Sequence, residues 1–579
     1  MMRSSINRLF LWGAGLVMTQ SVFAQPEEGF DQTLIITGDR TLSVQKAYKI
    51  SELPSVVDIS VDQMALSYQL IPRRPATKIE LEEIEPAKVK VREPLEKLYH
   101  GFVKGGFGTF ATPFLEASYT STRNRDFAYG VRVNHISAND GINRPVAFSG
   151  YSENAAEVWG KKVFRKHSFE SNIKYNRNVY HYYGFDPQDS DIDKNDIKQG
   201  YNDISLRSKW KSYYRDSSRV NHTIFLDSYF LTDRYDASEV GVKVEADLES
   251  VRGAQFYTLS TGLDFIGYQS DELGTFDFMN DTAGTKLGSS DQNNAIFKAV
   301  PKILLAKNGL RATVGLGLYG QFTNKARFHV FPDLEVSYAL FNDIFIPYAG
   351  ITGNVQRNSF RTLSNDNPFI LSNIQRLENS VVKYKVFGGF RGTVSDNLSF
   401  NLGASYQRVD NQVLYVNDTL VSSENRFDLI YDDVKTLTLK GELTYRYGEK
   451  WSATVSGHVY TYSTENEEEA WHLPSHRFAL KADYNLFDKF IIGGELAWVG
   501  QRMVKSYLPV VGLEPSDVGG FTAVKLDAYA DLSLSAEYRY TNRLSVFVEG
   551  HNLTATKYDI YYRFPTQRVF ILGGAKYSF

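Results

Sequence analysis

Apolar and polar side chains alternate along most of this chain. In residues 525–540 (KLDAYADLSLSAEYRY), the leucines and alanines fall on one face of an extended chain, and the lysine, aspartates, serines and glutamate fall on the other. Residues 436–447 (TLTLKGELTYRY) repeat the pattern. A period of two indicates a β-strand whose two sides have unlike surroundings. These strands are longer than the roughly 5–6 residues typical of a soluble sandwich, so a different β-architecture is predicted.

Two kinds of connection join the alternating segments. Tight turns such as Asn308-Gly309 alternate with longer polar stretches such as 271–294 and 358–382. Short turns at one end and long loops at the other are typical of outer-membrane barrels. Across residues 99–579 we count about 22 strands. An even number of strands places the beginning and the end of this sequence on the same, periplasmic side. The predicted fold is all-β: one large transmembrane antiparallel β-barrel after a short N-terminal periplasmic or lumenal segment.

The chain ends inside such a strand. In residues 566–579 (TQRVFILGGAKYSF), Tyr577 and Phe579 share a face with Ile571. Because lipid offers no water to an unpaired backbone, a strand that closes a barrel must be hydrogen-bonded along its length. We therefore expect this strand to close the barrel, with Phe579 at the periplasmic rim. Terminal aromatics such as Tyr577 and Phe579 resemble the signal read by the barrel-insertion machinery.

The N-terminus predicts export. Arginines precede an apolar run over residues 9–18, and Ala24 and Gln25 flank the expected cleavage position, so residues 1–24 are predicted to be a signal peptide. No later stretch approaches the ~18 apolar residues that a spanning helix needs.

Composition supports a membrane barrel and excludes other classes. The 37 Tyr and 38 Phe suit aromatic girdles at the two membrane interfaces. The absence of cysteine excludes disulfides and thiolate metal sites, and 64 basic against 67 acidic residues give no support for a nucleic-acid partner. We expect an integral outer-membrane protein that contacts outer-membrane lipids and, during biogenesis, the barrel-insertion machinery.

Two segments resemble TonB-dependent receptors. Residues 544–579 (LSVFVEGHNLTATKYDIYYRFPTQRVFILGGAKYSF) resemble the last hairpin of those barrels, and residues 473–500 (LPSHRFALKADYNLFDKFIIGGELAWVG) resemble an earlier hairpin. The shared features of the last hairpin are the Asn552-Leu553 step, Tyr558, Pro565, Arg568 and the terminal Phe579. The resemblance implies transport or binding of a nutrient at the cell surface, with a TonB-type energy transducer as partner.

The N-terminal segment departs from that family. The receptors carry a folded plug before the barrel, whereas residues 25–98 are much shorter than a full plug. Within this segment QTLIITG resembles the box that receptors offer to TonB, and its residues are Gln32, Thr33, Leu34, Ile35, Ile36, Thr37 and Gly38. The resemblance implies strand addition to TonB; the alternative is an ordinary short β-strand. A barrel of this size has a wide lumen, which residues 25–98, an inward loop or a partner closes unless the protein is an open pore.

One pair of residues raises an enzymatic alternative. His135 and Ser137 lie two apart in NHISAND, on the face that also carries Val131 and Val133, and this face is expected to look toward lipid near the outer rim. A lipid-facing His-x-Ser pair is similar to outer-membrane lipid deacylases, smaller barrels in which His activates Ser for acyl transfer. The other interpretation is two ordinary polar residues near a strand end.

Two polar loops contain residue types that bind metals. Residues 186–196 (DPQDSDIDKND) place aspartates at alternate positions, as calcium favours, although the EF-hand pattern fails. Residues 465–476 (ENEEEAWHLPSH) contain ligand types suited to a transition metal, namely Glu467, Glu468, Glu469, His472 and His476. Solvated loops account for both segments, and no catalytic or dinucleotide motif is present. We therefore predict no metal, no cofactor and no enzyme.

The favoured function is a TonB-dependent-receptor-like transporter in which residues 25–98 act as gate and coupling arm. An alternative of another class is a plugless accessory or structural subunit of an outer-membrane assembly or secretion complex, which predicts other outer-membrane or surface proteins as partners. A passive porin and a lipid deacylase are less favoured alternatives. The ligand is not predictable, because its specificity would reside in the loops.

Overall fold

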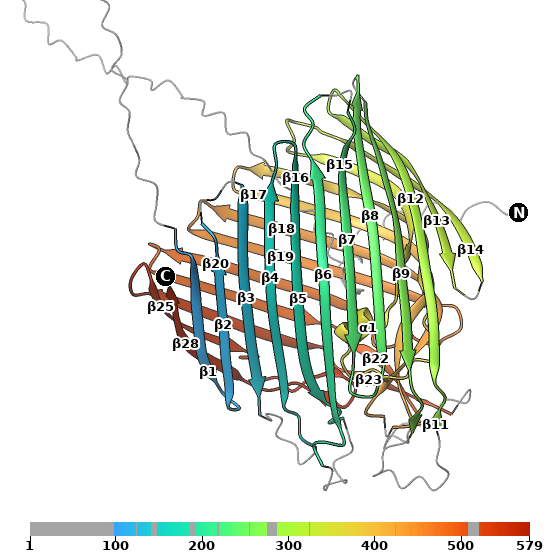
Figure 1. Cartoon of the computed structure of the whole chain (residues 1–579), viewed down its shortest axis with the longest axis vertical. Helices are drawn as coiled ribbons and strands as arrows, with labels where there is room; N and C mark the ends of the chain where they lie inside the picture. The colour runs from blue at the N-terminus through green and yellow to red at the C-terminus, as the bar shows by residue number, and fades with distance from the viewer. Residues whose placement is uncertain are drawn as a thin grey trace, which may run out of the picture. The chain divides into compact units, whose positions relative to one another are not determined.

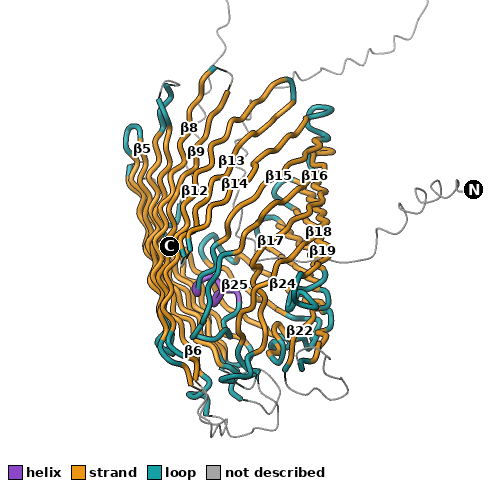
Figure 2. The backbone as a smooth tube through the Cα atoms, turned by 90° about the vertical axis from the view of Figure 1, so that its right-hand side faces the viewer, coloured by secondary structure: helices purple, strands orange, loops and turns teal. Residues whose placement is uncertain are grey.

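The described residues form a closed barrel. The computed structural model describes residues 98–122, 124, 126–139, 147–184, 193–216, 219–253, 255–274, 286–323, 325–422, 424–507 and 520–579. One antiparallel sheet of 22 strands is present in this part of the chain, and its strands wrap around a lumen (Figures 1 and 2). β1 (Gly101–Gly108) pairs with both β2 and β28 (Phe570–Ser578), which closes the sheet. The predicted fold class and strand number are confirmed.

The remaining strands of the wall follow one another in sequence order. They are β2 (Thr112–Thr120), β3 (Phe127–Ala138), β4 (Tyr151–Val163), β5 (His167–His181), β6 (Lys198–Ser212), β7 (Asn221–Thr232), β8 (Ser238–Arg252), β9 (Gln255–Ser270), β12 (Ser290–Lys307), β13 (Leu310–Phe322), β14 (Ala326–Tyr338), β15 (Ile346–Gln356), β16 (Ser380–Ser395), β17 (Leu398–Asn417), β18 (Phe427–Tyr447), β19 (Trp451–Thr464), β20 (His476–Leu486), β21 (Phe490–Val499), β24 (Tyr529–Arg539) and β25 (Leu544–His551).

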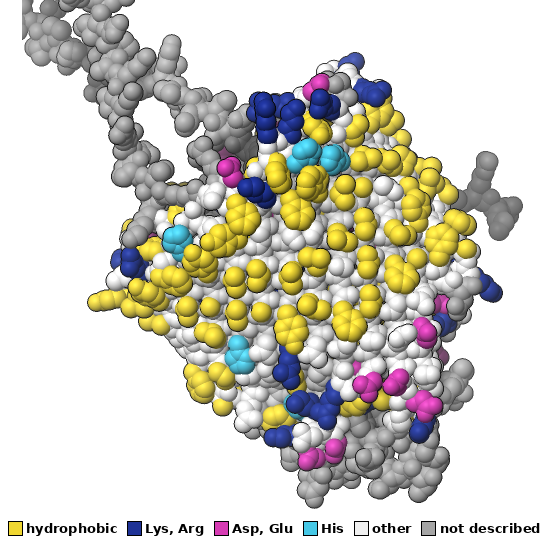
Figure 3. Space-filling view, in the orientation of Figure 1, with side chains coloured by type: hydrophobic (Ala, Val, Ile, Leu, Met, Phe, Trp, Pro, Cys, Tyr) yellow, Lys and Arg dark blue, Asp and Glu magenta, His cyan; other side chains and the backbone are white. Residues whose placement is uncertain are grey.

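The two faces of the wall differ as the alternation predicts. On β8, Val240, Val242 and Val244 are exposed on one face, whereas Lys243 and Glu245 alternate with them on the other face and form an ion pair. Figure 3 shows hydrophobic side chains spread over the strands, with charged side chains gathered toward the two ends. An outward apolar band with a polar lumen is what a lipid-embedded barrel requires.

The seam between the first and last strands is rich in glycine. β1 and β28 pair in register, and the N–H of Phe579 donates to the carbonyl oxygen of Gly101 (2.9 Å). Gly106 pairs with Gly574, and a Cβ on Gly574 would lie 2.1 Å from the carbonyl oxygen of Gly105. This approach of two backbones requires glycine. The last strand therefore closes the barrel, as expected from the alternation.

The connections at the two ends differ. Asn308 (φ +49°) and Gly309 (φ +80°) form a two-residue turn between β12 and β13, a geometry in which both residues need positive φ. The end that carries the longer connections is the outer end of a barrel of this type. One expected strand is divided: residues 525–540 contribute the last two residues of β23, which ends at Leu526, and then β24.

Several short elements lie outside the wall. The described residues contain no helix long and apolar enough to cross a membrane. Figure 2 shows the helix, drawn in purple, among the strands. The largest buried cluster joins this helix to the outer connections and includes Phe360, Phe369, Phe427 and Phe564. The short elements are α1 (Phe360–Asp366), β10 (Leu273–Gly274), β11 (Lys286–Leu287), β22 (Arg502–Ser506), β23 (Thr522–Leu526), β26 (Asp559–Tyr561) and β27 (Phe564–Pro565).

Candidate functional site

The connection between β15 and β16 folds into the barrel, and we call residues 357–379 the lumen loop. It contains α1, which begins with a capping box: Ser359 Oγ accepts from the N–H of Thr362 (3.1 Å), and Thr362 Oγ1 accepts from the N–H of Ser359 (2.9 Å). A helix of seven residues is marginal by itself, so contacts with the wall must hold it.

A buried carboxylate of the wall binds the N-terminus of α1. Glu239, at the start of β8, accepts hydrogen bonds from the backbone N–H groups of Phe360 (2.7 Å) and Arg361 (3.1 Å). The hydroxyl of Tyr229 donates to the same carboxylate (2.7 Å). The first N–H groups of a helix have no partner within the helix, and a negative charge there is favourable. Glu239 therefore fixes where α1 begins.

The two ends of α1 are bonded to nearly opposite parts of the wall. Arg361 forms an ion pair with Asp203 on β6 (2.8 Å), and the Tyr415 hydroxyl on β17 donates to Asp366 (2.7 Å). Around the ring, nine steps separate the two strands (β7, β8, β9, β12, β13, β14, β15, β16, β17), close to half of the 22. The lumen loop therefore crosses the barrel interior.

The rest of the lumen loop is held through its backbone. The hydroxyl of Tyr182 donates to the carbonyl oxygen of Ile370 (3.2 Å), and the amide of Gln292 on β12 donates to that of Ile374 (2.9 Å). Because these bonds come from side chains rather than from a ladder, each depends on one residue of the wall. The loop is thus attached at separate points.

Gln199 links the loop to the connection between β7 and β8. Its buried Nε2 donates to Ser372 Oγ and to Asp233 Oδ2, both at 2.9 Å. Burial raises the pKa of Asp233 above its usual value, although hydrogen bonds from Ser372 and Gln199 oppose the rise. The buried acceptor and its donors satisfy one another, which favours a single position of the loop.

Aromatic packing completes the layer. The rings of Phe369 and Phe564 stack at 3.9 Å between centroids, which joins the lumen loop to β27. Backbone bonds from the N–H of Phe427 to Phe369 O (3.0 Å) and from the N–H of Leu371 to Phe427 O (2.8 Å) pair the loop with the start of β18. Apolar packing of this kind inside a lumen differs from the water-filled interior of a porin.

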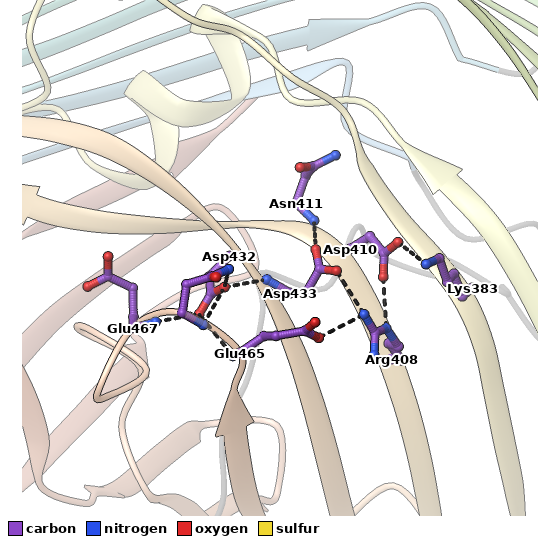
Figure 4. Close-up of polar contacts among 9 residues, drawn as sticks. Lys383, Arg408, Asp410, Asn411, Asp432, Asp433, Glu465 and Glu467 are labelled. Atoms are coloured by element: carbon purple, nitrogen blue, oxygen red, sulfur yellow. Dashed lines mark hydrogen bonds and ion pairs between the residues drawn. The ribbon is translucent and has the colours of Figure 1, made fainter.

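A second connection is anchored by one carboxylate. Asp432 on β18 accepts from the backbone N–H groups of Glu465 (3.1 Å), Asn466 (3.0 Å) and Glu467 (2.9 Å), as Figure 4 shows. These bonds fix the first turn of residues 465–475, which follow β19. The anchor is therefore structural.

Beside this anchor, one arginine is surrounded by acids. Arg408 on β17 bonds to Asp410 (3.0 Å), Asp433 (2.9 Å) and Glu465 (2.8 Å), and Lys383 pairs with Asp410 (Figure 4). The network ties the outer ends of β16, β17 and β18 to the anchored connection. Several charges in one network stabilise more than isolated surface pairs do.

The Glu- and His-containing residues 465–476 do not gather around a metal position. His472 is buried against the rings of Phe427 (5.3 Å) and Tyr561 (5.7 Å), and burial lowers its pKa to about 3. Glu467 instead bonds to the Trp471 indole and pairs with Lys505, both at 2.7 Å. Among the described residues, no group of three or more His, Cys, Asp or Glu is placed to hold a metal ion.

A polar cavity of about 460 Å³ lies between α1 and the wall. Charged residues of both signs line it, so it suits a small polar ligand rather than an apolar one. Because Arg361 belongs to α1, a ligand in this cavity contacts the lumen loop directly. The lining residues are Glu153, Asn172, Lys174, Asn176, Asn178, Tyr180, Tyr201, Asp203, Ser205, Arg207, Leu231, Arg361, Thr362, Ser364 and Asn365.

Solved structures resemble this barrel closely in fold and distantly in sequence. The FrpB iron transporter of Neisseria meningitidis superposes with a TM-score of 0.62 at 10% identity, covering 84% of this chain and 82% of that one. The pyoverdine receptor FpvA of Pseudomonas aeruginosa gives 0.61 at 12% identity, covering 84% and 79%. The ferric-catecholate import receptor Fiu of E. coli gives 0.59 at 10% identity, covering 83% and 82%. No protein-family model and no curated protein matches this chain.

The chain has the barrel fold of the TonB-dependent receptors. The resemblance found in the sequence is thereby confirmed for the fold. Within this barrel, Tyr577 and Phe579 lie on the outside at the end of the closing strand, both exposed. Their role as an insertion signal stays a prediction.

The other predicted site residues divide into two groups. Ala24, Gln25 and the TonB-box-like residues 32–38 lie outside the described residues, as does most of the Asp-rich segment 186–196. His135 and Ser137 are described, and their side chains are hydrogen-bonded (3.2 Å) on the outer surface.

Sequence reasoning missed the lumen loop as a site. Residues 358–382 were expected as an outer loop, and their inward course was only one of several alternatives for closing the lumen. The available signal was their apolar content, NPFILSNIQRL (367–377), which is unusual for a solvated loop.

Proposed function

We propose that this protein is an outer-membrane importer of a small polar nutrient, built as a TonB-dependent-receptor barrel with the lumen loop as an inner gate. The observation that supports it best is the attachment of α1 to both β6 and β17, because it places a small, separately bonded segment across the transport path. Such a segment favours a gated path over an open, water-filled channel.

The proposed transport cycle follows from the cavity and its neighbours. A ligand that reaches the cavity beside α1 competes with Asp203 for Arg361. The loop then leaves its aromatic packing, which requires work. Strand addition of residues 32–38 to a TonB-type transducer would supply it, with residues 25–98 as the coupling arm after removal of residues 1–24. The names of the similar receptors make a ferric chelate the ligand class to test first.

Conductance of the purified chain in planar bilayers tests the gate. Gln356 pairs directly with Ser380 in the β15–β16 ladder, so a short glycine-rich turn can replace residues 357–379 without disturbing the wall. We expect the unchanged protein to remain closed and the loop-replaced protein to conduct. The matched control is Arg376→Ala, an exposed residue of the same loop, which should stay closed. An unchanged protein that conducts would instead identify a porin.

Coupling is tested separately in cells. Uptake of a ferric chelate should disappear when residues 32–38 are deleted and when the transducer is absent. Native mass spectrometry of gently extracted protein distinguishes the accessory-subunit alternative, because that function requires a stoichiometric partner. If the protein is closed, shows no uptake and is recovered in such a complex, transport is contradicted and a role in assembly is supported.

A further inference from the structure

Three side chains on the outside of the barrel form a nucleophile–base–orienter arrangement. Ser137 and His135 share the outward face of β3, and their Oγ and Nε2 atoms are 3.2 Å apart. His135 is directly opposite Asn154 on β4, and His135 Nδ1 lies 2.7 Å from Asn154 Oδ1. The sequence pointed only to the His-x-Ser pair; the third member comes from the neighbouring strand.

The hydrogen bonds assign the tautomer of the histidine. Asn154 Nδ2 donates to Ser152 Oγ (3.0 Å) and to the carbonyl oxygen of Arg177 (3.1 Å), so its Oδ1 must face His135. A carbonyl oxygen only accepts, so Nδ1 carries the proton and Nε2 presents a lone pair to Ser137. This is the relation between serine, base and orienting group in acyl-transfer enzymes.

The three residues lie at the depth expected for the ester groups of a lipid rather than for its acyl chains. On the same face of β3, Val131 and Val133 are exposed and belong to the apolar band, and His135 and Ser137 follow directly toward the outer end. The ester groups of a bilayer lie at this boundary between hydrocarbon and headgroups. Arg177, opposite Asn154 on β5, is exposed and offers a positive charge to a phosphate.

The geometry points to a lipid acyl hydrolase site in which Ser137 and His135 are the catalytic residues, Asn154 is the positioning residue, and the substrate is an acyl ester of an outer-leaflet lipid. This activity goes beyond the proposed transport function and does not depend on it. The sequence offered this activity only as an alternative, from the spacing of His135 and Ser137; Asn154 and the hydrogen bonds come from the structure.

The reaction takes place in two balanced steps. Ser137 Oγ bonds to the ester carbonyl carbon while its proton passes to His135 Nε2; the ester C–O bond then breaks, and Nε2 gives the proton to the departing lipid oxygen. Water next gives a proton to Nε2 and bonds to the acyl carbon. The bond from Oγ to the acyl group breaks, Oγ regains the proton, and a fatty acid leaves.

Fatty-acid release by the full chain tests this assignment. The purified protein is mixed with phosphatidylethanolamine vesicles in one arm and with lipid A-containing vesicles in the other, and free fatty acid is quantified. We expect release in at least one arm, which identifies the lipid source, and a loss of at least about 10³-fold in Ser137→Ala and His135→Ala. Release in neither arm overturns the proposal, as does release that Ser137→Ala leaves unchanged.

Two further variants separate catalysis from folding. Ser171→Ala removes another outward serine, one bonded to Ser208 (2.9 Å) and remote from any histidine, and should leave release unchanged. Asn154→Asp keeps an acceptor for Nδ1 but adds a charge that stabilises the imidazolium, so the acidic limb of the pH–rate profile should move to higher pH. An acidic limb that stays in place would show that residue 154 does not bond to the catalytic imidazole.

Discussion

The barrel wall and the lumen loop are held in place by different kinds of hydrogen bond, although the loop is a direct continuation of two wall strands, β15 and β16. In the wall, every strand pairs with its sequence neighbour, and the backbone ladder repeats the same bond many times. The lumen loop is instead held by single side chains of other segments, such as Tyr182 and Gln292, which donate to its backbone carbonyl oxygens. The wall tolerates the loss of one ladder bond, whereas each attachment point of the loop depends on one buried side chain.

The difference suits a division of labour. Regions attached by few, separate contacts open locally at a lower free energy than regions held by a cooperative ladder. The lumen loop is therefore the part of the interior that can move while the membrane-spanning sheet remains intact.

The largest expected effect is a loss of stability of the wall at its seam. Gly574→Val places side-chain atoms against the carbonyl oxygen of Gly105, and relief requires the closing strands to separate. We expect more than about 4 kcal/mol of destabilisation and little folded protein, measured by migration of unheated samples in detergent gels. The matched control is Gly105→Val, because a Cβ there meets nothing within 4 Å. Equal folding of both variants would contradict the seam as a point of close backbone approach.

The next effect concerns the loop alone. Arg361→Ala leaves Asp203 without its cation, in a pair whose side chains are 14% and 11% exposed. We expect local opening of α1 to become easier by about 3 kcal/mol, which raises hydrogen exchange of residues 360–366 about 100-fold. Exchange in β6 to β9 should not change. Arg376→Ala, with a side chain 62% exposed, should alter neither region. Faster exchange throughout the wall would remove the distinction between the two regions.

A smaller effect distinguishes charge from hydrogen bonding at the other end of α1. Tyr415→Phe removes the donor to Asp366 and should ease opening by about 2 kcal/mol. Burial raises the pKa of Asp366, so the folded loop binds the proton more tightly than the open loop does. Loop stability should therefore rise as pH falls toward the carboxylate range, and Asp366→Asn should remove this slope while keeping the acceptor. Exchange measured against pH decides between these outcomes.

The effect that is smallest near neutral pH has the opposite pH dependence. The pKa of buried His472 is lowered to about 3, whereas a histidine in an open loop titrates near its usual value of about 6.5. The stability that depends on neutral His472 is complete above that value and falls by about 1.4 kcal/mol per pH unit below it. Exchange of residues 465–475 should accelerate accordingly. His472→Asn, which tolerates the φ of +58°, should abolish the acid sensitivity; an unaltered slope would assign it to another group.

The sequence predicts the wall far better than the loop, for a physical reason. Alternation at period two reflects the surroundings of each strand, lipid or lumen, and each strand carries that information locally, as Val240 and Lys243 on β8 show. The bond between Tyr415 and Asp366 follows no period, and it depends on where β17 stands around the ring. The apolar residues within 367–377 indicated that this segment is buried, but they did not indicate which strands it contacts.

The same limit applies to the outer surface. The spacing of His135 and Ser137 was visible in the sequence because both lie on one strand. Asn154 was not, since its position opposite His135 depends on the register between β3 and β4. A register is set by the turn and by the whole ladder, not by any short motif.

The seam also has a consequence for the order of events during assembly. Every other pair of neighbouring strands can form as a local hairpin, but Phe102 meets Ser578 only after nearly the entire barrel sequence is in place. Joining such distant points costs about 5 kcal/mol of chain entropy, against little for the turn at Asn308-Gly309. The last intermediate on the pathway is therefore an almost complete sheet with two unpaired edges, the kind of edge that invites pairing with other chains. Its lifetime, rather than the formation of any hairpin, sets how long the growing barrel needs protection.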